Sequence, residues 1–144
     1  MRAVIQKCLE SKVEVDNKTI SSIGRGLVVL VGFTHDDTEK DIEFLSNKVV
    51  NLRIFEDEKG VMNRSVLQEN GEILCISQFT LYGNAQKGNR PSYSEAMHSD
   101  EAEKLYDKFC EKLNSSVPTK KGVFGADMKV SLINDGPTTI IIHS

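Results

Sequence analysis

The C-terminal part of the chain has the pattern of buried β-strand on both sides of a Gly-Pro dipeptide. The two strand-like stretches are residues 128–133 and 140–142, and Gly136 and Pro137 lie between them. Proline has no N–H to donate to a neighbouring strand, and X-Pro is the one common peptide bond that can be cis. We therefore expect a kink at which two carbonyl oxygens turn the same way, toward a small polar group. An ordinary turn before an edge strand is the alternative interpretation.

A second segment, residues 73–83, begins as an apolar strand pattern and becomes polar before it ends. Period-two alternation predicts Gln78 and Thr80 on one face of this strand, and Ser77 and Phe79 on the other. An amide and a hydroxyl would then share a face. Ordinary half-buried strand residues are the alternative, because threonine is a good β-former.

The rest of the pattern predicts an α+β domain. Strands are expected at residues 2–9, 12–15, 19–23 and 27–33, with a hairpin turn at Asp16-Asn17, and strand is expected again from Lys121 onward. Apolar residues at positions 42, 45, 49 and 52 predict a helix of about four turns after the N-cap pair Asp36-Asp37. A second helix is predicted from Ser99-Asp100 to a point before Pro118. This order is typical of a mainly antiparallel, β-barrel-like sheet.

Composition limits the class of protein. The 144 residues, 39% of them hydrophobic, suffice for a single domain over residues 1–144. The longest apolar run is too short to span a bilayer and the start of the chain lacks a secretory signal, so we expect a cytoplasmic protein with no membrane association. The three cysteines, Cys8, Cys75 and Cys110, are widely spaced, which indicates reduced core thiols. We expect no metal and no cofactor.

Side-chain catalytic motifs are absent from the sequence. It contains no G-x-S-x-G, no H-E-x-x-H, no phosphate-binding glycine loop and no close Cys/His pair. The histidines, His35, His98 and His143, are interpreted as structural or surface residues. We therefore expect no side-chain catalytic triad.

Residues 77–81, Ser-Gln-Phe-Thr-Leu, and residues 134–139, Asn-Asp-Gly-Pro-Thr-Thr, together resemble the two signature motifs of the D-aminoacyl-tRNA deacylases, also called D-tyrosyl-tRNA deacylases. Shorter resemblances occur in the expected order at residues 1–6, 51–55, 87–92 and 124–128. The resemblance implies the deacylase-type fold, with two outer helices around the β-barrel-like body. It also implies a homodimer with active sites at the subunit interface, where the Gly-Pro of one subunit reaches into the site of the other.

The resemblance implies a hydrolase that cleaves the ester bond at the 3′ end of D-aminoacyl-tRNA, releasing the free D-amino acid and tRNA. It assigns catalysis to Ser77, Gln78, Phe79 and Thr80, with backbone amides around Phe79 and Thr80 facing the ester carbonyl and the terminal 2′-OH of the tRNA helping to activate water. Such an ester is already reactive, so positioning can suffice. Attack by the Thr80 hydroxyl is the alternative, although no base partner for it is visible.

Gly136 and Pro137 are the residues to which the resemblance assigns substrate binding and rejection of L-amino acids. If both carbonyl oxygens face the substrate amino group, a D side chain projects outward and an L side chain collides with backbone. Glycine has no side chain to collide. We therefore expect proofreading of many D-aminoacyl-tRNAs and cleavage of mischarged glycyl-tRNA as well.

Further residues are implied in supporting roles. The candidates for supporting the site are Lys7, Phe124, Gly125, Ala126, Met128, Asn134 and Thr139, and the candidates for tRNA contact are Lys87, Asn89 and Arg90. Solvated surface residues are the alternative for the basic set, and the net charge of −3 argues against a broad nucleic-acid surface.

Two positions depart from the family pattern. Lys7 stands where arginine is usual, and it lacks the guanidinium fork that would clamp the Gly-Pro loop. Thr138 stands where valine is more common, and it adds a hydroxyl in a tight place. Fidelity against L substrates is the property that these departures put in question.

Two other functions are weighed. Cleavage of peptidyl-tRNA would need a catalytic histidine and a groove for a longer chain, and neither is apparent. A non-catalytic RNA- or protein-binding domain would explain the missing catalytic side chains. The sequence offers such a domain no aromatic stacking platform and no extended basic stripe.

Overall fold

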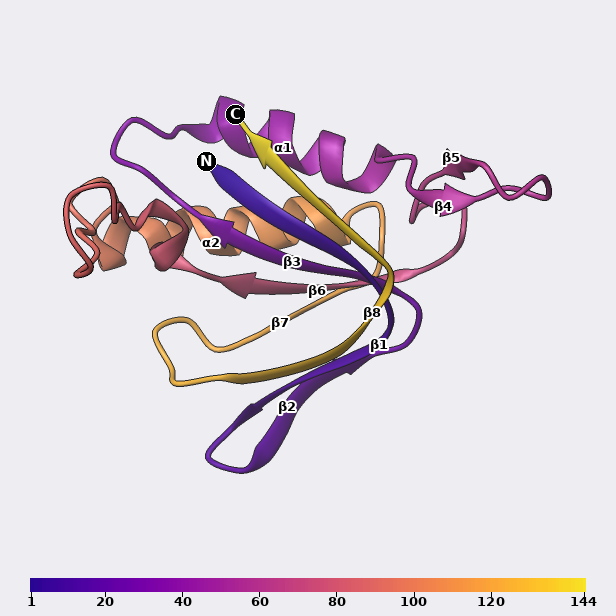
Figure 1. Cartoon of the computed structure of the whole chain (residues 1–144), viewed down its shortest axis with the longest axis horizontal. Coiled ribbons are helices and arrows are strands. Elements are labelled where there is room, and N and C mark those ends of the chain that lie inside the picture. The colour runs from indigo at the N-terminus through magenta and orange to yellow at the C-terminus, as the bar shows by residue number, and fades with distance from the viewer.

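A computed structural model describes the whole chain, residues 1–144. Its body is a six-stranded sheet in which β2, β1, β3, β6 and β7 are neighbours in that order, while β8 pairs with β1 (Figure 1). The strands of this sheet are β1 (Arg2–Val15), β2 (Lys18–Ile23), β3 (Gly26–Gly32), β6 (Glu72–Ser77), β7 (Thr119–Lys121) and β8 (Lys129–His143). The remaining elements are helices α1 (Glu39–Asn51) and α2 (Ser99–Asn114), the short 3-10 helix η1 (Phe79–Tyr82), and a small hairpin of β4 (Phe55–Glu56) and β5 (Met62–Arg64).

Strand β1 organises the sheet because it pairs with three other strands. It runs antiparallel to β2, β3 and β8, whereas the β3–β6 and β6–β7 pairs are parallel. The predicted α+β class and the mainly antiparallel, barrel-like sheet are therefore confirmed. The hairpin turn predicted at Asp16-Asn17 is also confirmed, and both residues have the positive φ that such a turn requires (+50° and +61°).

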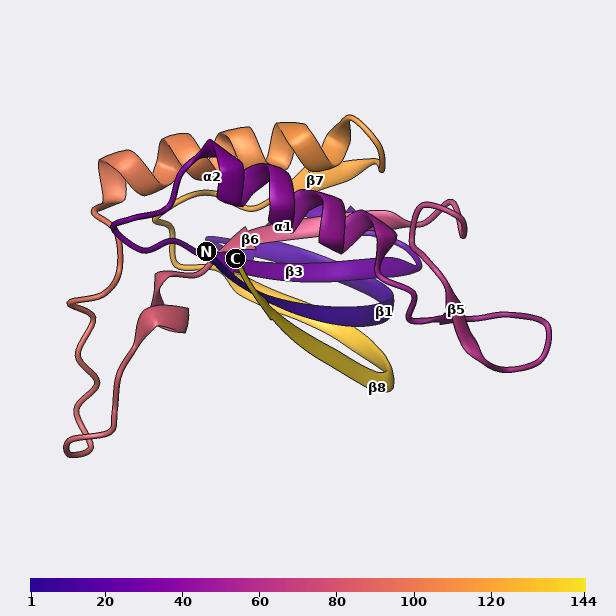
Figure 2. The same cartoon turned by 90° about the horizontal axis from the view of Figure 1, so that it is seen from above.

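The two helices cover one face of the sheet (Figure 2). Side chains from α1, α2 and the central strands, such as Leu45, Phe109 and Val29, form a core cluster of 23 buried residues between these layers. A second cluster of six buried residues, which includes Val13 and Leu74, fills the curled part of the sheet near β2 and β8. All three cysteines are buried and unpaired, as predicted. No helix has the length and apolar character needed to cross a membrane.

The prediction of a strand over residues 73–83 is wrong for the second half of that segment. β6 ends at Ser77, and the chain then turns into η1, so Gln78 and Thr80 do not alternate across a sheet face with Phe79. The physical reason is that the partner strand β3 itself ends at Gly32. The Gln78 N–H makes a last bond to the Val31 carbonyl (2.7 Å), and beyond it no strand remains to pair with.

Three smaller predictions also need correction. Residues 2–15 form one continuous strand rather than two, and the strand expected from Lys121 is interrupted by a loop before β8. The N-cap of α1 is Thr38, whose N–H and hydroxyl both donate to the Asp41 carboxylate (2.8 and 2.9 Å). Asp37 instead accepts from the Thr34 N–H (2.7 Å) and contacts the amino group of Met1.

The turn that follows β6 packs directly on Gly32. A Cβ atom at this position would lie 2.8 Å from the Gln78 carbonyl oxygen and 3.2 Å from the Leu81 Cβ. We expect Gly32→Ala to lower the free energy of unfolding by about 1–3 kcal/mol, because backbone must move to admit the methyl group. Urea unfolding measures this. Gly24→Ala is the control, since its nearest neighbouring atom would be 3.7 Å away; equal stability of the two variants would contradict the packing.

Candidate active site

A cavity of about 620 Å³ lies at the end of the sheet where β3 and β6 finish. Twelve of its nineteen lining residues are hydrophobic, which is typical of a pocket for an organic ligand. Three walls surround it: the ends of β3 and β6 with the start of η1, the segment leading into α2 with the first turn of that helix, and the loop before β8 with the start of that strand. The lining residues include, in the order of these walls, Ser77, Gln78 and Phe79, then Tyr93, Met97 and His98, then Phe124, Gly125, Ala126 and Met128.

The first wall carries backbone N–H groups without a partner. No protein acceptor lies within hydrogen-bond distance of the N–H of Phe79 or Thr80, because these residues begin a short helix. The Thr80 hydroxyl accepts a hydrogen bond from the Gln78 side-chain amide. No acidic or basic side chain bonds to the Thr80 hydroxyl. Phe79 lines the cavity, whereas Thr80 follows it directly and is not a lining residue. This turn therefore offers two adjacent free backbone donors and no activated nucleophile.

The second wall is the segment before α2. The Tyr93 ring meets the Phe79 ring edge-on, with centroids 5.2 Å apart, and both rings are partly exposed (40% and 58%). The Thr34 hydroxyl fastens the segment by donating to the Glu95 carbonyl (2.6 Å), and the Met97 N–H donates to the Phe33 carbonyl (3.0 Å). Two aromatic rings thus stand at the rim of the cavity.

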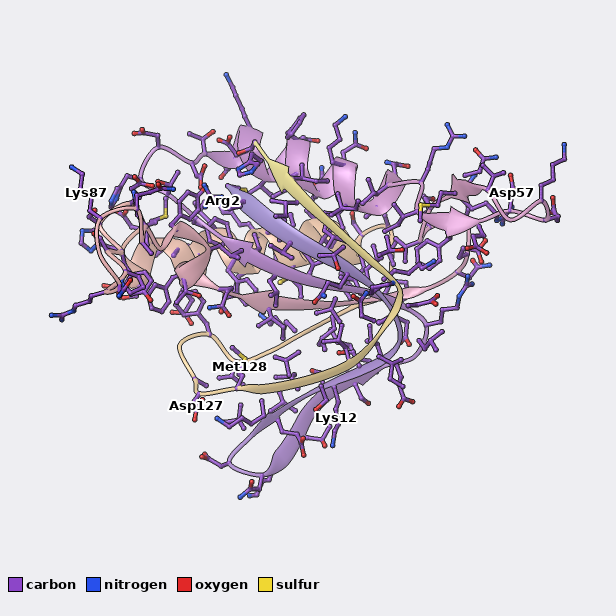
Figure 3. All side chains as sticks on the ribbon, viewed as in Figure 1. Arg2, Lys12, Asp57, Lys87, Asp127 and Met128 are labelled. Atoms are coloured by element: carbon purple, nitrogen blue, oxygen red, sulfur yellow. The ribbon has the colours of Figure 1, made fainter.

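The third wall is the loop at residues 124–128. Phe124, Gly125, Ala126 and Met128, all proposed as supporting residues, line the cavity. Gly125 has a φ of +72°, which favours glycine in this turn. Figure 3 shows Met128 on this loop and Lys87 at the same end of the molecule, with Asp57 at the far end.

The candidate tRNA contacts belong to the loop between η1 and Tyr93, which projects from this end of the molecule (Figure 2). Lys87, Asn89 and Arg90 are all exposed, and neither basic side chain makes an ion pair. Their charges therefore face solvent near the cavity.

The Gly-Pro dipeptide lies in a bulge of β8 opposite Lys7. The strands pair at Gln6↔Thr139 and Cys8↔Asn134, so residues 135–138 have only Lys7 across from them. The Gly136–Pro137 peptide bond is cis, and Gly136 has a φ of +117°. A Cβ at Gly136 would lie 2.5 Å from the Thr138 Oγ1, so the bulge leaves no room for a side chain at residue 136.

Three of the proposed supporting residues hold this bulge. The Asn134 side-chain amide donates to the carbonyls of Lys7 (2.9 Å) and Thr138 (3.0 Å). Its oxygen accepts from the Thr139 hydroxyl (3.3 Å). The buried Lys7 ammonium lies 3.6 Å from the Asp135 carboxylate. The Gln6 side-chain amide also donates to the Asn134 Oδ1 and the Thr139 Oγ1 (3.3 Å each), so the loop is braced by two amides and by a single long ion pair.

Within one chain, the two motifs do not come together. Ser77 pairs with Val31 at one end of β3, whereas Cys8, the partner of Asn134, pairs with Gly26 at the other end. Five residues of strand separate these ends, which corresponds to about 16 Å. Figure 1 shows β8 bending at the end of the sheet away from the tip of β6. None of the bulge residues lines the cavity.

Sequence reasoning missed the second wall. His98, interpreted as structural or surface, is exposed and lines the cavity at the start of α2. Tyr93 and Phe33 were not singled out, although Tyr93 directly follows the Lys-Gly-Asn-Arg-Pro-Ser segment. These residues reach the site through tertiary packing, for which the sequence carries no local signal. The structure has no group of three or more His, Cys, Asp or Glu side chains placed to hold a metal ion.

The sequence of this chain is similar to that of known deacylases over its whole length. A D-aminoacyl-tRNA deacylase of Clostridium botulinum (strain 657 / Type Ba4) is 54% identical over 145 residues, covering 100% of this chain and 97% of that protein. The D-aminoacyl-tRNA deacylase of Clostridium acetobutylicum is 52% identical with the same coverage.

Solved structures share the fold. One described as c-Myc DNA Unwinding Element Binding Protein matches with a TM-score of 0.95 and 44% identity over 100% of this chain and 99% of that one. A second, described as "a probable eukaryotic D-amino acid tRNA deacylase", has a TM-score of 0.84 at 20% identity over 98% and 97% of the two chains. A family model described as D-Tyr-tRNA(Tyr) deacylase matches residues 4–143. The chain therefore belongs to the D-Tyr-tRNA(Tyr) deacylase family.

Proposed function

We propose that this chain hydrolyses the ester bond of D-aminoacyl-tRNA mainly with backbone groups of residues 77–80, acting as one domain over residues 1–144. Deacylation of D-aminoacyl-tRNA, as an enzymatic activity, follows from family membership. The observation that carries the mechanism is the pair of unengaged N–H groups of Phe79 and Thr80 beside a largely apolar cavity. Such donors stabilise an oxyanion without having to reorganise during the reaction.

The reaction needs little else from the protein. Water attacks the ester carbonyl carbon, the carbonyl oxygen becomes negatively charged, and the bond to the ribose oxygen then breaks. The water supplies a hydroxyl to the amino acid and a proton to the ribose. We propose that the 2′-OH of the terminal ribose helps to orient and deprotonate the water, while the cavity holds the ester still.

The Thr80 hydroxyl is poorly placed to be a nucleophile. Its partner is the Gln78 amide, a hydrogen-bond donor that cannot accept its proton. An activated hydroxyl needs an adjacent general base, and no acidic or basic side chain bonds to Thr80. We therefore propose that Thr80 contributes its backbone N–H, and that Gln78 fixes the side chain.

We propose that a second copy of the chain completes the site in a homodimer. The Gly-Pro bulge lies at the wrong end of β3 to reach the cavity of its own chain. Large apolar side chains are exposed on β1 and β8, notably Ile141 (60%), Ile133 (50%) and Leu9 (49%), and the helices cover only the other face of the sheet (Figure 2). Exposed apolar surface of this kind marks an association face.

In the composite site we assign Gly136 and Pro137 to chiral selection. Their carbonyl oxygens would accept from the substrate amino group, and the backbone would occupy the space that an L side chain needs. Lys7 holds this bulge through one ion pair of 3.6 Å, where an arginine could make two parallel bonds. We therefore expect weaker rejection of L substrates than an arginine at this position would give.

The cavity and its surroundings are compatible with the 3′ end of an aminoacyl-tRNA. A volume of about 620 Å³ falls in the usual range for small-molecule sites. We propose that Lys87, Asn89 and Arg90 contact acceptor-stem phosphates, and that the protein acts in the cytoplasm, where its substrate is used. A net charge of −3 disfavours the broad nucleic-acid surface that binding of a DNA-unwinding element, named for the 44%-identical structure, would need.

The proposed activity is tested by following ester loss from four substrates. We expect D-tyrosyl-tRNA and glycyl-tRNA to be deacylated, and L-tyrosyl-tRNA and L-alanyl-tRNA to persist. Loss of none of the four would favour a non-catalytic RNA- or protein-binding domain. Glycyl-tRNA as resistant as L-alanyl-tRNA would contradict steric rejection as the source of selectivity.

A pair of substitutions at Phe79 separates the backbone from the side chain. Proline is well tolerated at the first residue of a helix, and Gln78, with φ −145° and ψ 85°, lies outside the α region that a following proline disfavours. Phe79→Pro removes the ring and one N–H, whereas Phe79→Ala removes the ring alone. We expect kcat of the proline variant to be about 10²–10³-fold below that of the alanine variant, the usual cost of one oxyanion donor.

Thr80→Ala completes this comparison because it keeps the N–H and removes the hydroxyl. Single-turnover deacylation of D-tyrosyl-tRNA by Thr80→Ala should stay within about tenfold of the unmodified rate, since positioning by Gln78 is all that is lost. A folded but inactive Thr80→Ala protein would restore the nucleophile mechanism.

Mixing two inactive variants tests the composite site. Phe79→Pro removes one of the two proposed oxyanion donors. Gly136→Val places a β-branched residue where the bulge requires a φ of +117°. After co-refolding of equal amounts, half of the dimers are mixed and each has one intact pair of motifs, so about a quarter of the unmodified activity should return. A mixture as inactive as its components, or a protein that stays monomeric in sedimentation, would refute the shared site.

A further inference from the structure

Arg2 reaches from the sheet to the turn that carries the free N–H groups. We propose that Arg2 is a positioning residue that holds η1 in the geometry needed for ester cleavage. This inference rests on the proposed function of residues 77–80. Arg2 itself does not line the cavity, so it would act through the turn and not on the substrate.

The contacts of Arg2 are concentrated on the end of η1. Its Nη1 donates to the Leu81 carbonyl, and its guanidinium carbon lies 4.7 Å from the centroid of the Tyr82 ring. Its Nε lies 3.3 Å from the His143 Nδ1. Tyr82 is itself buried, and this burial raises the pKa of its phenol to about 12, so the ring that receives the guanidinium stays neutral.

The backbone of Arg2 is rigidly placed. Arg2 pairs with Gly32 of β3 on one side and with His143 of β8 on the other. A residue held between two strands has little freedom, so the direction of its side chain is set by the sheet. Figure 3 shows Arg2 beside the end of β8, on the part of β1 nearest the chain termini.

The turn depends on few other bonds. Its start is joined to the sheet by the Gln78 N–H on the Val31 carbonyl (2.7 Å). Within the turn, the Leu81 and Gly83 N–H groups bond to the Gln78 and Thr80 carbonyls (3.3 and 2.9 Å). The Leu81 carbonyl, at the other end, has Arg2 as its donor. Phe79 and Thr80 therefore lie between two anchors, one made by backbone and one made by Arg2.

Loss of the second anchor should shift the N–H groups without unfolding the protein. Misplacing catalytic groups by about 1 Å can cost about 10²-fold in rate. Lysine can replace the charge but offers neither the planar fork nor the stacking surface of a guanidinium. The proposal thus predicts a graded order, with arginine best, lysine intermediate and an uncharged side chain worst.

Steady-state deacylation of D-tyrosyl-tRNA by Arg2→Met and Arg2→Lys tests the proposal. We expect Arg2→Met to lower kcat by about 10–10²-fold with KM within about threefold, and Arg2→Lys to recover part of kcat. Arg53→Met is the matched control, because the Arg53 guanidinium also donates to a backbone carbonyl, from its Nε to that of Asn63 (2.9 Å), and Arg53 does not line the cavity. Its kcat should be unchanged.

A raised KM with unchanged kcat would make Arg2 a tRNA contact and overturn the proposal, as would full activity of Arg2→Met. Hydrogen exchange gives a readout that does not depend on activity. The Leu81 and Gly83 amides should exchange at least several-fold faster in Arg2→Met than in Arg53→Met, while core amides of α2 stay protected. Equal exchange rates in the two variants would refute the anchoring role of Arg2 even if the protein is an active deacylase. An unmodified protein without deacylase activity would refute only the proposed function.

Discussion

Backbone pairing along β1 is the constraint on which the rest of this structure depends. One strand of fourteen residues hydrogen-bonds to β2, β3 and β8, so its register places almost every functional segment. Its pairing with β3 fixes the position of Gly32, on which the turn after β6 packs. Its pairing with β8 at Cys8 fixes where the bulge of β8 begins. The helices add the buried apolar area that stabilises this arrangement, but they contribute little to the chemistry.

The candidate site is built from main-chain groups to an unusual degree. Free N–H groups at residues 79 and 80 and carbonyl oxygens at residues 136 and 137 carry the proposed mechanism. The side chains of Asn134 and Arg2 bond to main-chain carbonyls, and that of Gln78 bonds to the Thr80 hydroxyl. Such a site suits an ester that is already reactive, because orientation and charge stabilisation supply most of what is needed. Glycine at residues 32 and 136 suits this arrangement, because a Cβ there would lie 2.8 Å from the Gln78 carbonyl oxygen and 2.5 Å from the Thr138 Oγ1.

Sequence reasoning predicted those parts that depend on local pattern. Hydrophobic spacing located α1 and α2, and the Asp16-Asn17 turn followed from turn chemistry. The extension of β6 through residue 83 failed because alternation says nothing about where a neighbouring strand stops. The same limit hid the second wall of the cavity, since Tyr93 and His98 arrive there only through packing. The residues from the resemblance did fall into two spatial groups, but their separation is a property of strand register that no one-dimensional pattern contains.

The location of the two motifs at opposite ends of β3 has a consequence for how such a protein works in the cell. If each working site needs halves from two chains, catalysis vanishes upon dissociation, and at low abundance the number of functional sites falls with the square of chain concentration. Newly made protein would then have no deacylase activity until its concentration is high enough for dimers to form. A chain damaged in both motifs would disable both sites of any dimer that it joins, so the intact motifs of its healthy partner would be lost as well.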